Sequence, residues 1–231
     1  MSIKKDFNRK NRSQSQTHNK RTGKNTKNKR ALMIIACEGL ETEKNYFNAI
    51  FNELKAQKKL SANSLVIAKH NHTNPTGVLK DLQDHIDTKT GLTYKDYDHR
   101  WIVIDRDEER VNGGGHTPQD FNTALNLAKN KDKKKEVKVA WSNPSFELWY
   151  LLHFVFQNTP IDRNTVCDKL EKHSKQKYIK NDSEMYNKLS HLTETASSNA
   201  KKLINEDTVP EKANPATTVY KLVELFLSFN K

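Results

Sequence analysis

Carboxylate side chains follow three short apolar segments of this 231-residue chain. Glu38 comes directly after the first segment, Asp105 and Asp107 follow a second, and Glu147 lies shortly after a third. Like charges a few ångströms apart do not all remain ionised unless a cation lies between them. Carboxylate oxygens are also preferred ligands of hard cations such as Mg²⁺. If folding gathers these acids, the pattern predicts a site for Mg²⁺ or Mn²⁺.

Phosphodiester cleavage is the reaction that suits such a site, because one or two metal ions can activate water, neutralise the phosphate and stabilise the leaving oxygen. Glu38 would act as general base or acid, or as a metal ligand, and the sequence does not separate these roles. Alternation along an extended segment points Asp105 and Asp107 to the same side, and Gly39 permits a sharp turn beside Glu38. The alternatives are a solvated or capping Asp pair, and a Glu147 that complements a helix dipole. The placement of the acids at strand ends favours the metal site.

Alternating strand and helix patterns would position these acids. Short apolar runs predict buried strands at 31–37, 64–68, 100–104 and 137–141. Helical spacing follows each of the first three, with Ile86 marking the second helix and Leu127 an apolar anchor of the third. Asn143 and Pro144 predict the N-cap and first turn of a helix through Phe156. This order predicts a parallel α/β sheet, whose ligands bind at the carboxyl ends of the strands.

Three regions are expected: a basic tail (1–30), a catalytic α/β domain (31–158) and a helical appendage (159–231). The tail holds eleven Lys or Arg against one acid, whereas the other 201 residues carry a net charge of only +2. Its composition offers little to bury, so we predict that it is disordered and binds nucleic acid by releasing counterions. The alternative is a solubilising extension. The candidate phosphate-binding residues are Lys20, Arg21, Lys24, Lys27, Lys29 and Arg30.

Several other classes of site and location are disfavoured. The chain has no apolar stretch of the ~20 residues needed for a membrane span and no signal-peptide pattern, so we expect a cytoplasmic protein with no membrane partner. The two cysteines, Cys37 and Cys167, form no CxxC pair, and phosphate-loop and HExxH motifs are lacking. His70 and His72 could contact phosphate or a metal, but a role as loop histidines is favoured.

Several motifs resemble those of the RloB-like family, over about residues 33 to 226. More broadly, Glu-Gly after an apolar strand and Asp-x-Asp after a later one resemble the Toprim domain of topoisomerases, primases and several nucleases. The RloB-like motifs are Cys37-Glu-Gly-x-x-Thr-Glu-x-x-Tyr-Phe47, Ile104-Asp-Arg-Asp107, Ser142-Asn-Pro-Ser-Phe-Glu-Leu-Trp149 with His153-Phe154, and Asn214-Pro-x-Thr217.

The resemblance implies a Toprim-like, four-stranded parallel sheet flanked by helices, with a C-terminal helical appendage. It also implies a metal-dependent endonuclease or nickase of a bacterial restriction or phage-defence system, similar to overcoming-lysogenization-defect nucleases. The implied ligands of Mg²⁺ or Mn²⁺ are Glu38, Glu43, Asp105, Asp107 and Glu147, although those nucleases usually place the second acid four residues after the first and Glu43 lies five after Glu38.

The implied substrate is nucleic acid, with DNA favoured over RNA. The chain carries no ATPase motor of its own, so a separate ATPase subunit is an expected partner, and homo-oligomerisation is left open. The alternatives are a non-catalytic nucleic-acid-binding module and a Toprim enzyme that processes RNA.

Overall fold

The computed structural model describes residues 32–107 and 116–229. Its centre is a five-stranded sheet with the order β2-β1-β3-β4-β5. The first four strands in sequence run parallel, and the short fifth strand runs antiparallel to β4. The bounds are β1 (Met33–Cys37), β2 (Leu65–Ile67), β3 (His99–Asp105), β4 (Lys138–Asn143) and β5 (Ala216–Thr217). The predicted α/β class is confirmed, and the sheet is mostly rather than wholly parallel.

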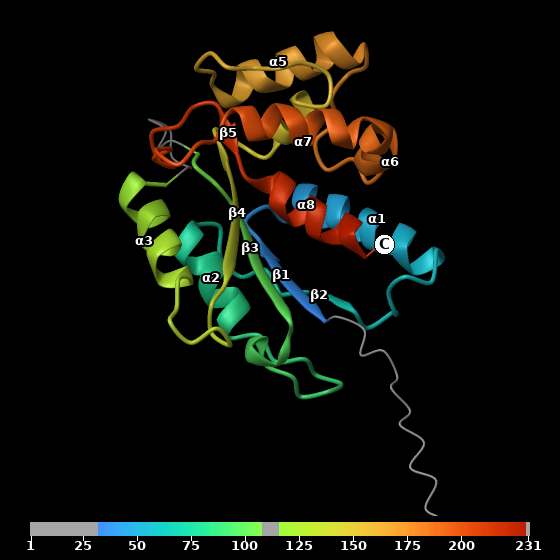
Figure 1. Ribbon diagram of the computed structural model, residues 1–231, viewed down its shortest axis with the longest axis vertical. Helices are drawn as coiled ribbons and strands as arrows, with labels where there is room; N and C mark the ends of the chain where they lie inside the picture. Colours follow the sequence, from blue (N-terminus) through green and yellow to red (C-terminus); the bar gives the residue numbers. More distant parts are fainter. Residues whose placement is uncertain (1–31, 108–115, 230–231) are drawn as a thin grey trace, which may run out of the picture.

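Helices cover both faces of the sheet and the carboxyl ends of its strands (Figure 1). Helices α2 (Pro75–Gln83) and α3 (Pro118–Ala128) lie on one face, and α1 (Thr42–Ala56) and α8 (Val219–Ser228) lie on the other. The remaining segments are α4 (Glu147–Leu151), α5 (Arg163–Ser174), α6 (Met185–Leu189), α7 (Thr193–Lys202) and the short 3-10 turns η1 (Tyr94–Asp96) and η2 (Ser190–Leu192). Figure 1 shows α5, α6 and α7 beyond the ends at which β3 and β4 finish.

The continuous apolar character of β1 follows from the burial of both faces of the sheet. Ile34 and Ala36 belong to the core beneath α2 and α3, whereas Met33 and Ile35 belong to the core beneath α1 and α8. All four side chains are almost fully buried. A strand that packs on both sides needs apolar residues at every position, so alternation is lost.

The sheet has one strand more than predicted. Residues from 160 onwards show only helical spacing, but Ala216 and Thr217 pair with Asn143 and Ser142 of β4. A two-residue strand has no periodicity of its own, so only its pairing partner reveals it. The same pairing explains why Asn143 is not the N-cap of a helix: it is the last residue of β4, and α4 begins only at Glu147.

Two expected helical anchors lie outside the core. Helix α2 ends at Gln83, and Ile86 is 62% exposed and forms an isolated bridge with Thr93. Leu127 is in α3 as predicted but is 59% exposed, because Phe121 and Ala124 occupy the buried face of that helix. Both residues fit a helical pattern by sequence spacing alone, and the real packing face differs from the predicted one.

Elements after residue 159 share the main core with the sheet. Leu170 of α5, Tyr186 of α6 and Phe226 of α8 pack in the same apolar cluster as Val103 of β3. The proposed division at residue 158 remains a prediction. Within the described part of the chain, every helix is too short or too polar to cross a membrane.

Candidate functional site

The ends of β1 and β3 place two carboxylates side by side at the carboxyl edge of the sheet. Glu38 follows β1, and its backbone N–H donates to the Val103 carbonyl at 3.0 Å, which continues the parallel ladder by one residue. Its side-chain Oε2 accepts a hydrogen bond of 3.0 Å from the backbone N–H of Asp105, the last residue of β3. His116 also approaches Glu38, with Nδ1 3.4 Å from Oε1. Neighbouring strand ends therefore hold Glu38 against Asp105.

Glu43 reaches the same edge from the first turn of α1. Its side chain is buried, and its Oε2 has no hydrogen-bond partner among the described residues. A Cβ atom built on Gly39 would lie 1.9 Å from this oxygen, so the glycine leaves the space into which the carboxylate extends. The φ angle of Gly39 is not in the left-handed region. Glycine here leaves room for the Glu43 carboxylate and does not serve a left-handed backbone.

Glu147 is the first residue of α4 and has a partner for each carboxylate oxygen. The Ser145 hydroxyl donates to Oε2 at 2.7 Å, and the Tyr178 hydroxyl donates to Oε1 at 3.1 Å. Both Ser145 and Glu147 are buried. Two donors from different segments fix the rotamer of this carboxylate, which a solvated helix-end acid would not require.

Arg163, the first residue of α5, places a guanidinium among three of these acids. Its Nη1 donates to Asp107 Oδ2 at 2.5 Å. Its Nη2 lies 3.7 Å from Asp105 Oδ2 and 3.8 Å from Glu147 Oε2. One planar cation therefore contacts carboxylates that follow two different strands, which is the geometry that makes Arg suited to several acceptors at once.

Burial and like charges shift the titration of the site. Burial, followed by the charges of Glu43 and Glu38, holds the pKa of Asp105 well above its usual value. Burial is also the main cause that raises the pKa of Glu43 to about 7, with repulsion from Glu147 and Glu38 adding to it. For Arg163, burial lowers the pKa, but Asp105 and the neighbouring acids outweigh it and raise the pKa. The acids are thus close enough to affect one another's charge.

The donor set fits a hard divalent ion in chemistry but is not arranged around one point. Glu43 Oε2 and Asp105 Oδ1 are buried oxygens without a hydrogen-bond partner in the described structure, and oxygens of this kind are ligands for Mg²⁺ or Mn²⁺. Across residues 32–107 and 116–229, no three His, Cys, Asp or Glu side chains stand close enough to hold a metal ion together. The cation that the carboxylates share is the guanidinium of Arg163.

A small pocket opens next to the acids. Its volume is about 170 Å³, and its walls include Gly39, Glu43, Glu147 and Arg163 together with exposed Lys180. This pocket connects Glu43 and Arg163 with the surface between α1 and the segment before α6. Of the five acids, Glu43 and Glu147 line it, so these are the two that an ion or a phosphate oxygen in the pocket would meet.

Sequence and structure agree on which acids come together. All five predicted acids lie at the carboxyl edge of the sheet, within electrostatic reach of one another or of Arg163 (Glu38, Glu43, Asp105, Asp107 and Glu147). Their roles in metal binding and catalysis remain predictions. The predicted phosphate-binding residues Lys20, Arg21, Lys24, Lys27, Lys29 and Arg30 lie outside the described residues. His72 is in the loop before α2, where its Nδ1 lies 2.6 Å from buried Asp81.

Sequence reasoning missed Arg163 and Tyr178, which lie far from the acids along the chain. Neither belongs to a motif, and both come from the region that reads only as helical. Asp162 before Arg163 is a recognisable N-cap signal, because its side chain accepts from the backbone N–H groups of Asn164 and Thr165. That signal predicts where the helix begins, but not that its first residue faces three carboxylates.

A family comparison agrees with the motifs. The model of the RloB-like protein family matches residues 33–226, which includes every element from β1 to most of α8. The chain belongs to the RloB-like family. Curated proteins and solved structures gave no match. The matched range contains Glu38, Asp105 and Glu147.

Proposed function

We propose that this RloB-like chain is a divalent-metal-dependent nuclease that cleaves phosphodiester bonds of nucleic acid. The observation that supports it best is the convergence of five carboxylates from the ends of β1 and β3 and the starts of α1 and α4 on one edge of the sheet. Burying several like charges is costly, and a fold that only needed surface acids would not gather them. Binding a hard cation is the function that explains this cost.

The residues that would hold the ion are Glu38, Glu43, Asp105, Asp107 and Glu147. A bound Mg²⁺ or Mn²⁺ would supply activation of water and neutralisation of the phosphate. The protein's own contribution is orientation. The Asp105 N–H fixes Glu38, while Ser145 and Tyr178 fix Glu147, so these two carboxylates are held before any ligand arrives.

We further propose that the domain is Toprim-like and serves restriction or phage defence, with nucleic acid as substrate and a separate ATPase as partner. Support for the fold comes from the order of its acids: Glu38-Gly39 follows β1, and Asp105-x-Asp107 follows β3, its neighbour in the sheet. DNA is favoured over RNA. The defence role and the ATPase rest on the family resemblance alone.

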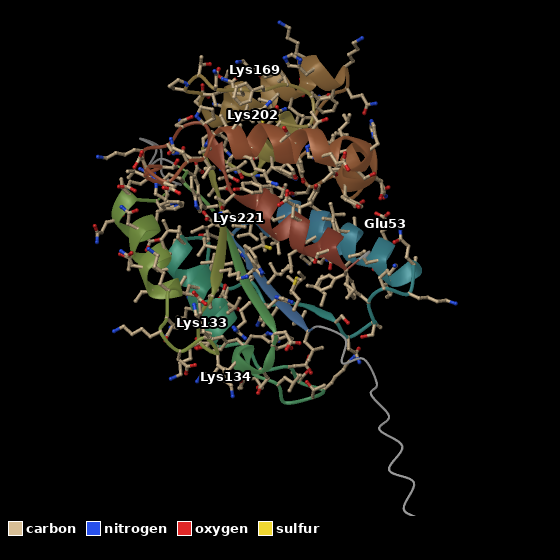
Figure 2. All side chains as sticks on the ribbon, viewed as in Figure 1. Glu53, Lys133, Lys134, Lys169, Lys202 and Lys221 are labelled. Carbon is tan, nitrogen blue, oxygen red and sulfur yellow. The ribbon has the colours of Figure 1, made fainter. Side chains whose placement is uncertain are left out.

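Incubation of the purified protein with plasmid and linear DNA, with Mn²⁺ or with EDTA, tests the activity. We expect cleavage with Mn²⁺ only, and loss of cleavage in Asp105→Asn and Glu38→Gln, which keep the size of each side chain. Asp132→Asn is the matched control, because Asp132 is an exposed turn residue far from the acids. Figure 2 shows its neighbour Lys133 at the opposite end of the sheet from Lys169 of α5. If Asp105→Asn and Glu38→Gln cut as fast as the wild type, the site is misassigned.

One observation favours a second candidate, a nucleic-acid-binding module without catalysis. The acids already have a cation in Arg163, and the described residues hold no ready three-ligand metal group. Binding that persists in EDTA without product would support this candidate. The same assay with structured RNA tests the RNA-processing alternative.

A further inference from the structure

The cation among the acids is delivered by a part of the chain that is distant in sequence. Arg163 is 56 residues after Asp107, and it belongs to α5, which lies beyond the carboxyl ends of the strands (Figure 1). Its Nη1 lies 2.5 Å from Asp107 Oδ2, and its Nη2 lies 3.8 Å from Glu147 Oε2. The guanidinium thus lies among oxygens that a metal ion would need as ligands.

Several contacts hold the start of α5 in this place. The Asp162 side chain caps the helix, and the Ile161 N–H donates to Asn214 Oδ1 at 3.1 Å. Ile161 and Val166 pack with Leu151 of α4 in a small separate core. The backbone of Arg163 is therefore anchored, while its side chain keeps 29% of its surface exposed and lines the pocket next to Glu43. The side chain can move without unfolding the helix.

We propose that Arg163 is a built-in competitor of the divalent ion, so that the ion binds only as the guanidinium leaves the carboxylates. The inference rests on the proposed metal-dependent function and adds a regulatory step to it. Arginine stays protonated, and two cations that share the same oxygens repel each other. Arg163 offsets part of the negative charge of the carboxylates in the ion-free protein, and its displacement sets the ion concentration at which the site fills.

Two buried carboxylate oxygens have no competing hydrogen bond among the described residues and can accept the ion. Asp105 Oδ1 and Glu43 Oε2 have no hydrogen-bond partner in the described structure, and both residues are 4% exposed. Arg163 contacts the other oxygen of Asp105, Oδ2. Glu43 lines the pocket and Asp105 lies behind it, so an ion that enters the pocket meets Glu43 first and then draws the shared carboxylates away from the guanidinium.

Mn²⁺ binding to full-length protein, measured by titration calorimetry at a fixed pH of about 8, tests this inference without any substrate. Arg163→Gln is expected to bind Mn²⁺ about tenfold or more tightly than the wild type, because the guanidinium-bound state no longer competes. Lys180→Gln is the charge-matched control. Lys180 lines the same pocket but is exposed, so its loss should change affinity less than about threefold, since exposed charges are screened. Arg163→Lys, which keeps the charge but cannot span two acceptors, should fall in between.

A second readout reports displacement directly and does not need a variant that folds well. Exchange of the Arg163 guanidinium protons in the wild type, followed by NMR, should become faster on addition of Mg²⁺, because the side chain releases its three carboxylates. An unchanged exchange rate at saturating Mg²⁺ overturns the displacement. Equal Mn²⁺ affinity in the wild type and Arg163→Gln, or equal gains in Arg163→Gln and Lys180→Gln, overturns the competition. If Mn²⁺ binds as expected but DNA is not cut, the competition stands and the nuclease proposal fails. If the wild type and Arg163→Gln bind Mn²⁺ equally well and Mn²⁺-dependent cleavage occurs, the nuclease proposal stands and the competition fails.

Discussion

Substitution of Gly39 by alanine tests whether Glu43 is held where the structure places it. The new Cβ would lie 1.9 Å from Glu43 Oε2 and 2.7 Å from its Cδ. Ordinary contact begins at 3.4 Å, so the oxygen has to move by about 1.5 Å. The backbone at Gly39 is not left-handed, so alanine adds no φ strain and the clash is the destabilising part of the perturbation.

The expected cost follows from overpacking, which destabilises a core by about 1–3 kcal/mol. The carboxylate is the end of a flexible side chain, and a pocket of about 170 Å³ lies next to it. We therefore expect the low end, about 1 kcal/mol, for Gly39→Ala. With Glu43→Ala in the background the clashing atoms are absent, so the same substitution should cost almost nothing.

Urea unfolding of the wild type, both single variants and the double variant gives the coupling energy directly. We expect about 1 kcal/mol of coupling between Gly39→Ala and Glu43→Ala. Gly77→Ala is the matched control, because its new Cβ would meet His72 and Asn74 instead, and its cost should be the same with and without Glu43. Additive effects of the first pair, within about 0.5 kcal/mol, would refute the placement of Glu43 against Gly39.

Three further outcomes are expected. Tyr46→Phe should lower the free energy of unfolding by about 1–3 kcal/mol, because the buried indole N–H of Trp149 donates to the Tyr46 hydroxyl at 2.8 Å and would lose its acceptor. An unchanged midpoint of urea denaturation contradicts this. Burial lowers the pKa of His153 from 6.5 to about 4. Between these two pH values the unfolded chain binds a proton that the folded chain does not, so the free energy of unfolding decreases as the pH falls through this range. In His153→Asn the amide can replace Nδ1 as donor to the Trp149 carbonyl, and the variant should lose about 3 kcal/mol less stability on acidification. If the free energy of unfolding falls equally steeply with pH in the variant and the wild type, this explanation is wrong. Removal of residues 1–30 should weaken nucleic-acid binding most at low salt and leave turnover at saturating substrate unchanged. If the full-length protein binds nucleic acid independently of salt, residues 1–30 are not an electrostatic arm.

The order of elements could be predicted because buried parallel strands and amphipathic helices leave strong local patterns. The residues of β1 and residues 101–104 of β3 are apolar at every position, since both faces of the sheet are covered. Strand β5 could not be predicted, because two residues carry no period and depend on pairing with Ser142 and Asn143. Ile86 and Leu127 show the same limit: helical spacing does not reveal which residues face the core.

For the site, the sequence by itself determined the chemical identity of the acids and their position after β1 and β3. Parallel strands finish at one edge of a sheet, so residues at strand ends meet wherever those strands are neighbours. Only the tertiary structure decided what lies among the acids. Arg163 and Tyr178 come from a helical region without a motif, and their approach depends on the docking of α5 and the segment after it. Local patterns encode which face of an element is buried, whereas contacts between distant segments depend on the packing of the whole chain.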